Sequence, residues 1–231
     1  MGKKPTICYL CGQPLIGKFS RDHIPPKQFL AEELRRKHSA QLFCLPVHEA
    51  CNLGFQNDED YFVYSLMPLG RGSYSGDALR RKILEDCTQH PQQRTLLNKV
   101  LNEFERRPSG LILPPDLVAK RFEGERILRV AWKIVRGLYF SHFNAFVPED
   151  APKACEVIPP GQKPPDSFLM LLDGENRGKY PGVFDYRFRA FPDAHNLNYW
   201  AMLLWDRIIV TMTFEFPSCN CSDCLSQAME T

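Results

Sequence analysis

Two short motifs rich in metal ligands constrain the first part of the chain more than any other feature of the sequence. The first reads Cys-Tyr-Leu-Cys and the second His-Glu-Ala-Cys, and the stretch between them is long enough for two strands and a loop. Two ligands separated by two residues can reach one ion, and four nitrogen or sulfur ligands satisfy tetrahedral Zn²⁺. The sequence therefore predicts a structural zinc site made by Cys8, Cys11, His48 and Cys51. Cys44 competes with His48 for this role, but it lacks the two-residue spacing from Cys51, so we interpret it as a buried thiol.

The cysteine content also bears on the compartment. The chain of 231 residues contains nine cysteines, and its first residues are not followed by an apolar segment of the kind found in signal peptides. No apolar run approaches the roughly 20 residues that span a bilayer. An odd number of cysteines without an export signal favours reduced thiols. We therefore expect a cytoplasmic protein with no membrane partner.

The hydrophobic pattern predicts an α+β fold in two parts. Apolar residues at helical spacing predict helices over residues 27–38, 57–66, 77–107 with a break at Pro91, and 123–143. Apolar runs predict strands over residues 42–47, 168–172, 183–191 and 198–216, the last folded back near Asp206. Proline-rich residues 147–165 should form a loop or an edge. We expect a zinc-binding unit of residues 1–66 and, after a glycine-rich hinge at 70–76, an accessory α+β domain of residues 67–231 that ends in an antiparallel sheet.

Four segments around the zinc ligands carry a resemblance to a known family. In chain order they are CYLCG, SRDHIPP, LPVHEACN and NDEDYF. Their short motifs are common individually, but half-sites that bracket Asp22-His23, with Asn52 directly after the second half-site, form a specific order. Over about residues 8–60 the chain resembles the HNH endonuclease family, in a zinc-containing variant with Asn in place of the third His. The resemblance implies a small zinc-bound ββα-metal unit, treble-clef-like, that hydrolyses phosphodiester bonds of DNA.

The resemblance assigns roles to three residues. His23 is the expected general base, because an imidazole with a pKa of about 6.5 can take a proton from water at neutral pH. Asp22 and Asn52 are the expected ligands of a catalytic divalent cation, Mg²⁺ or Mn²⁺, since both offer the oxygen atoms that hard cations prefer. Adjacent residues of a strand point to opposite faces, so Asp22 can hold the ion while His23 faces the attacking water.

The match to the family is incomplete at several positions. The middle Asn, which tethers the loop that carries the base, has no clear counterpart, and Gln41 is the nearest amide. Phe55 stands where a basic residue is common. Asp58 or Asp60 could complete the metal shell, although Asp58 could instead cap the following helix. These departures keep a second hypothesis open, in which the chain is a non-catalytic zinc module that binds nucleic acid or protein.

Basic residues in two places could contact DNA, the partner that the family resemblance implies. The first 40 residues are basic and the next 20 are acidic, which suits a phosphate backbone beside a cation, although chance clustering also explains it. One face of the helix expected over 123–143 carries Arg126, Arg129, Lys133 and Arg136. These four could grip phosphates, or they could form the solvated side of an amphipathic helix. The accessory domain would supply target recognition or self-association, and a homodimer could make double-strand breaks because one such site normally cuts one strand.

Further cysteines near the C-terminus could bind a second zinc ion. Cys219, Cys221 and Cys224 lie within six residues, and the fourth ligand could be Cys87 or His90. Free thiols at a frayed terminus are the alternative. A redox function of Cys8 and Cys11 is disfavoured, because zinc would sequester both thiols.

Overall fold

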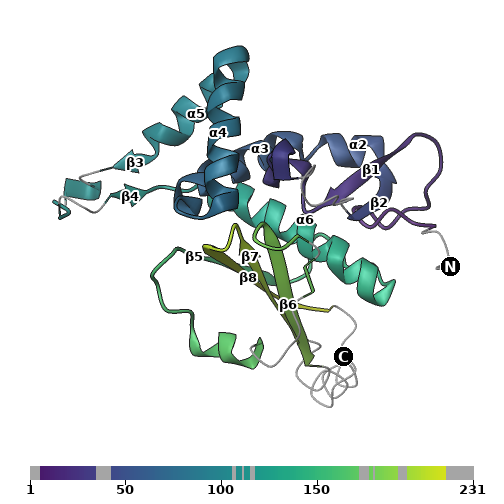
Figure 1. The fold of residues 1–231 in the computed structure, drawn as a ribbon. Coiled ribbons are helices and arrows are strands. Elements are labelled where there is room, and N and C mark those ends of the chain that lie inside the picture. The colour runs from purple at the N-terminus through teal and green to yellow at the C-terminus, as the bar shows by residue number, and fades with distance from the viewer. Residues whose placement is uncertain are drawn as a thin grey trace.

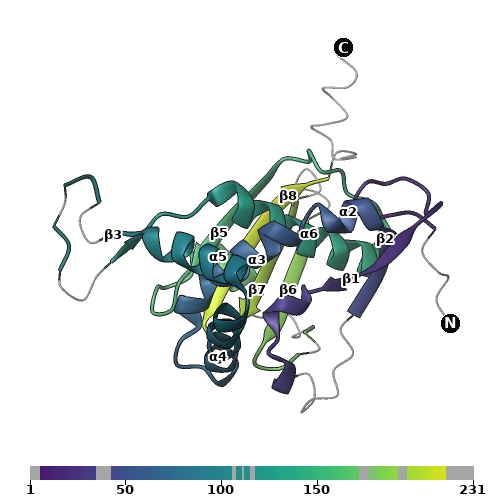
Figure 2. The same cartoon turned by 90° about the horizontal axis from the view of Figure 1, so that it is seen from above.

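The central element of the fold is a long helix, α6 (Gly124–Phe143), against which both halves of the chain pack (Figure 1). An antiparallel sheet covers one side of α6, and the N-terminal hairpin and helix α3 lie on the other side, as the two views show (Figure 2). Every residue from Val130 to Leu138 is buried. A helix buried all round is typical of a core element. This combination of helices and antiparallel strands confirms the predicted α+β class.

The N-terminal unit contains a hairpin followed by two helices. The computed structural model describes residues 6–34, 43–105, 108–110, 112–114, 118–171, 177–178, 180–191 and 197–216. Strands β1 (Phe19–Ile24) and β2 (Phe43–His48) pair antiparallel and lead into helices α2 (Glu49–Leu53) and α3 (Gln56–Leu66). The strand expected over 42–47 and the helix expected over 57–66 are confirmed.

The helix expected over residues 27–38 is interrupted. A 3-10 turn, η1 (Lys27–Phe29), is followed by extended backbone at Leu30 (φ −112°, ψ 126°) and by a helical turn at residues 32–34. Phe29, Leu30 and Leu34 are all buried, so the apolar spacing identified contact residues correctly. It did not specify one continuous helix, because a short apolar run fits several backbone shapes equally well.

Helices in the middle of the chain follow the predicted break at Pro91. They are the 3-10 turn η2 (Met67–Gly70), α4 (Tyr74–Gln89) and α5 (Pro91–Asn102), with the short pieces β3 (Phe104–Glu105), η3 (Pro108–Gly110) and β4 (Ala119–Lys120) beyond them. The segment expected as a hinge is a capped turn, because Gly76 N donates to Ser73 Oγ (3.0 Å) at the start of α4. None of the helices in the described part of the chain combines the length and apolar character needed to cross a bilayer.

The sheet has the strand order β5-β8-β7-β6, with all neighbours antiparallel. Its strands are β5 (Lys153–Ile158), β6 (Phe184–Phe191), β7 (Leu197–Leu204) and β8 (Ile208–Glu215). The chain folds back between β7 and β8 at Asp206, as predicted, and β5 from the proline-rich segment forms an edge. The expected strand at 168–172 was wrong: the 3-10 helix η4 (Asp166–Leu171) lies there, since a short apolar run cannot be assigned to strand or helix by periodicity alone.

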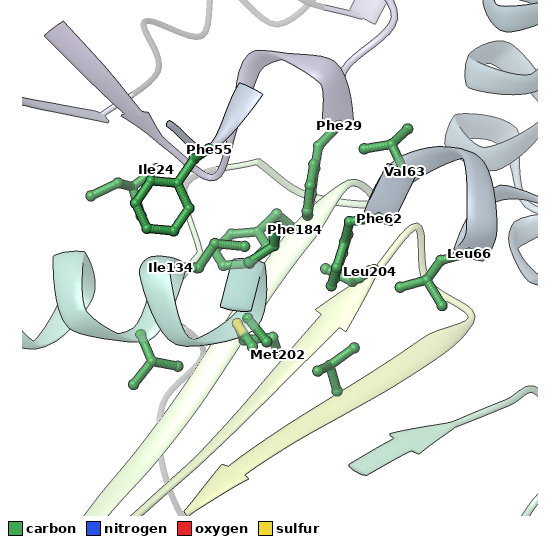
Figure 3. Close-up of a cluster of buried hydrophobic side chains, with 14 of the residues drawn as sticks. Ile24, Phe29, Phe55, Phe62, Val63, Leu66, Ile134, Phe184, Met202 and Leu204 are labelled. Atoms are coloured by element: carbon green, nitrogen blue, oxygen red, sulfur yellow. The ribbon is translucent and has the colours of Figure 1, made fainter. Parts of the chain in front are cut away.

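A continuous buried cluster joins the N-terminal unit to the sheet (Figure 3). Phe29 and Phe62 stack with ring centroids 5.4 Å apart, and the Trp205 indole nitrogen donates to the carbonyl oxygen of Phe29 (3.0 Å). Ile134 of α6 and Phe184 of β6 belong to the same cluster. The boundary expected after residue 66 therefore does not divide the hydrophobic core.

Gly137 of α6 permits the closest approach of this helix to β1, and its replacement should test that contact. A Cβ atom at this position would overlap Ile24 Cδ1 and lie 3.2 Å from Tyr9 Cζ. Both neighbours are buried and cannot move aside freely. We expect Gly137→Ala to lower the free energy of unfolding by about 1–2 kcal/mol in denaturant titrations, although alanine is the better helix former.

Gly124→Ala is the matched control on the same helix. Nothing lies within 4 Å of a Cβ built at Gly124, so alanine there should leave stability equal or slightly higher. Equal stability of the two variants would contradict a close contact between α6 and β1.

Candidate metal centre and adjacent pocket

The four predicted zinc ligands come together in the structure. One ligand atom from each of them lies within 4.8 Å of the other three, namely Cys8, Cys11, His48 and Cys51. A tight turn presents the first two, since Gly12 N donates to Cys8 O (2.7 Å) and Gly12 adopts a positive φ of 73°. Three sulfurs and one imidazole form a closed set of the kind that structural zinc occupies. This cluster can therefore hold a metal ion such as zinc.

The orientation of His48 suits a metal ligand. Its Nε2 lies 3.0 Å from the carbonyl oxygen of Pro14, and its Nδ1 lies 3.3 Å from Cys11 Sγ. Because a carbonyl can only accept, Nε2 carries the proton and the lone pair of Nδ1 faces the sulfurs. A hydrogen bond of this type fixes the tautomer of a metal-binding imidazole.

The thiols of the cluster also favour a cation. Burial, followed by the neighbouring Cys8 and Cys11, raises the pKa of Cys51 to about 12. Three sulfurs so close together repel one another as thiolates, and a divalent cation removes that repulsion when it replaces their protons.

A pocket of about 250 Å³ lies beside this unit and brings together the three residues that the family resemblance singled out. Asp22 and His23 enter from the end of β1, and Asn52 enters from α2. Asn52 Nδ2 donates to Ser20 Oγ (3.0 Å), which leaves the amide oxygen as the atom that can bind a cation. The remaining residues of the wall are Arg21, Pro26, Lys27, Gln28, Leu53, Gln56 and Glu59.

Asp22 has buried partners that the sequence did not reveal. Its carboxylate is only 3% exposed; Lys133 Nζ lies 2.7 Å from Oδ1, and the Tyr9 hydroxyl donates to Oδ2. Burial, together with the Asp22 charge, raises the pKa of Tyr9, so the phenol keeps its proton and remains a donor. Both carboxylate oxygens therefore already accept from protein groups. Each carboxylate oxygen still has a second lone pair.

Glu59 is a pocket residue that the sequence reasoning missed. Its carboxylate contacts Lys133 Nζ, and Gln28 Nε2 donates to its other oxygen (3.3 Å). Burial raises the pKa of Glu59, although Lys133 opposes the effect. The available signal was helical spacing, because Glu59 shares a face of α3 with the buried residues Phe62, Val63 and Leu66.

Asp58 and Asp60 do not line the pocket. Asp58 Oδ1 accepts from Arg126 Nε (2.6 Å) and Oδ2 accepts from Arg129, while the start of α3 has no side-chain cap. Asp58 is therefore an ion-pair partner of α6, which corrects both earlier interpretations. Burial raises the pKa of Asp60.

The basic residues of α6 do not form one exposed face, because two of them are buried and two are not. Lys133 and Arg136 are each only 1% exposed, and Arg136 donates to the carbonyl oxygens of Val147 (2.9 Å) and Leu10 (2.8 Å). Arg126 and Arg129 share Asp58 as described above. For Lys133 and Arg136 both expectations were wrong, because α6 is buried on two sides there and these cations pair with groups of the packed elements.

Some predicted residues fall elsewhere. Gln41, Cys219, Cys221 and Cys224 lie outside the described residues. Cys87 is buried, with its sulfur 4.0 Å from the Tyr64 hydroxyl, and His90 is exposed at the junction of α4 and α5.

Comparison of the chain with models of known protein families, with curated proteins and with solved structures finds no match.

Removal of one sulfur at a time should show whether Cys51 is a metal ligand and Cys44 is not. We expect the purified protein to contain about one zinc ion per chain and Cys51→Ala to lose it, because three remaining ligands cannot close the site. Cys44→Ala should retain the metal, since Cys44 is not part of the cluster. Elemental analysis after gel filtration gives the answer, and equal zinc loss from both variants would contradict this ligand set.

Replacement of Lys133 should show how much two buried carboxyl groups destabilise the fold when they lack their cation. We expect Lys133→Met to lower the free energy of unfolding at pH 7 by about 3–5 kcal/mol, because Asp22 and Glu59 lose their shared cation. Arg129→Met on the same helix is the control; its side chain is 44% exposed and its loss should cost at most about 1 kcal/mol.

The deficit of Lys133→Met should also depend on pH. Burial raises the pKa of Glu59 and Lys133 opposes that rise, so loss of the ammonium moves the folded-state pKa of Glu59 further above its unfolded value, and protonation then favours the folded state. The deficit should therefore shrink as the pH falls towards about 4, the range of ordinary carboxyl groups. Denaturant titrations across this range test the sign; a deficit that grows on acidification would contradict the assignment.

Proposed function

We propose that this protein is a metal-dependent endonuclease of the HNH type that hydrolyses phosphodiester bonds of DNA. The observation that carries the proposal is the shared pocket of Asp22, His23 and Asn52 beside the Cys8–Cys51 metal cluster. Asp22 and His23 are neighbours in β1, whereas Asn52 follows β2 in the sequence, yet all three line one cavity. An imidazole and two oxygen-bearing side chains are the groups that hydrolysis of a phosphodiester requires.

His23 is the proposed general base. It occupies the end of β1, next to the turn at Pro25-Pro26, and lines the pocket together with Asp22, whose carboxylate also contacts Lys133 of α6. A neutral imidazole can take the proton of a water molecule that attacks phosphorus.

Asn52 and Asp22 would hold the divalent cation, Mg²⁺ or Mn²⁺. Two protein oxygens, with water and substrate phosphate, form the kind of ligand set that Mg²⁺ accepts. The bound ion would stabilise negative charge on the phosphate and on the departing oxygen. Glu59 places a second carboxyl group beside Asp22, and one lysine, Lys133, contacts both.

Lys133 and Tyr9 are proposed to hold Asp22 in place. The two groups bind opposite oxygens of the carboxylate, so its plane is fixed before any cation arrives. Fixed ligands bind metal more strongly than mobile ones, because less conformational freedom is lost on binding.

A non-catalytic zinc module that binds nucleic acid or protein is the second candidate. One observation favours it: Lys133 already supplies a positive charge to Asp22 and Glu59. A lysine in this position satisfies the carboxylates without a divalent cation. DNA as partner and a homodimer as the cutting form stay predictions under either function.

A plasmid-nicking assay distinguishes these two functions. Zinc-loaded protein freed of Mg²⁺ and Mn²⁺ should be inactive, and addition of either ion should start cleavage. We expect His23→Ala to lower the cleavage rate by about 10²–10⁴-fold, the contribution typical of general base catalysis. Asn52→Ala should raise the Mg²⁺ concentration needed for half-maximal activity.

His90→Ala provides the matched control for this assay. His90 is exposed and lies outside the pocket wall, so its replacement should leave the rate unchanged. Zinc content should be equal in all variants. Cleavage by His23→Ala at the rate of the unmodified protein would exclude the proposed mechanism.

A further inference from the structure

The cations of α6 already pair with groups of the protein. Arg126 and Arg129 share the carboxylate of Asp58, Lys133 is enclosed by the pocket carboxylates, and Arg136 is bound by Glu149 and backbone oxygens. A cation that already pairs with a carboxylate has less charge to offer a phosphate, and Lys133 and Arg136 are also removed from solvent. The substrate needs other partners.

Two exposed cations lie in the wall of the pocket itself. Arg21 belongs to β1 and Lys27 to η1, and both side chains are exposed. Neither forms a salt bridge with any residue in the described part of the chain. In this respect they differ from the four basic residues of α6.

Their positions relative to His23 are defined by the hairpin. Arg21 precedes His23 by two residues on the same strand, so the two side chains share one face of β1. Lys27 follows the Pro25-Pro26 turn on the other side of His23. Cys44 is the cross-strand partner of His23. Burial raises the pKa of the Cys44 thiol, and Arg21 and Lys27 lie close enough to oppose this rise.

We propose that Arg21 and Lys27 bind the phosphates on either side of the scissile one, so that the pocket takes a polyanionic strand rather than an isolated phosphodiester. This inference rests on the proposed function, because it places the scissile phosphate at His23. Exposed cations of this kind contribute affinity through counterion release and carry no sequence preference. The substrate class is therefore a nucleic acid with phosphates flanking the cleaved bond.

Salt dependence of DNA binding tests the contacts without cleavage. With Ca²⁺ in place of Mg²⁺, the affinity for a labelled duplex is measured across a series of salt concentrations. Arg21→Ala and Lys27→Ala should each weaken binding by about tenfold. Each should also reduce the slope of log affinity against log salt by about 0.9, the value for one phosphate contact. Arg21→Lys should restore the slope.

Arg80→Ala is the matched control for charge. Arg80 is exposed on α4 and does not line the pocket, so its loss should leave the slope unchanged. Zinc content and unfolding midpoint should not differ among these surface variants. Slopes unchanged in both Arg21→Ala and Lys27→Ala would overturn the inference.

Comparison of two substrates distinguishes contacts with the flanking phosphates from contacts with the reacting phosphate. Arg21→Ala and Lys27→Ala should raise KM for plasmid DNA by about tenfold with little change in kcat, and should cleave bis(p-nitrophenyl) phosphate at the unmodified rate. Equal losses on both substrates would overturn the inference, because the cations would then act at the scissile group. A protein that binds DNA through these residues and never cleaves it would support the contacts and contradict the proposed function.

Discussion

The contact of Lys133 with Asp22 and Glu59 is the interaction on which the pocket depends. The three charges come from α6, β1 and α3, and they meet almost completely removed from water. Each alone would be strongly unfavourable there, and together they satisfy one another. The cluster therefore fixes α6, β1 and α3 relative to one another, and β1 and α3 supply residues of the pocket wall. The hydroxyl of Tyr9 extends it to the segment that carries the first metal ligands.

The metal cluster and the pocket are connected through the chain itself. His48, Cys51 and Asn52 follow one another over the end of β2 and the start of α2. An ion that immobilises His48 and Cys51 consequently limits where Asn52 can lie, and the hydrogen bond to Ser20 fixes its amide. A short helix with no buried residue of its own gains rigidity in this way.

Sequence reasoning succeeded where chemistry depends on local spacing. The four metal ligands form the cluster that their spacing indicated, and the residues chosen at positions 22, 23 and 52 line one pocket. It failed where packing decides the outcome. The cations of α6 were read as facing solvent because a single amphipathic helix normally has a wet side. Glu59 was missed because its neighbours Asp58 and Asp60 look equivalent in sequence, and only the phase of α3 separates them.

The position of α6 in the chain has a consequence for biogenesis. Lys133 is synthesised more than 70 residues after Glu59. A nascent chain of which only the metal-binding segment has left the ribosome therefore still carries two carboxyl groups without their cation. Such an intermediate lacks the rigid wall described above. The pocket can be completed only when α6 has emerged and docked, which ties its assembly to the later part of translation.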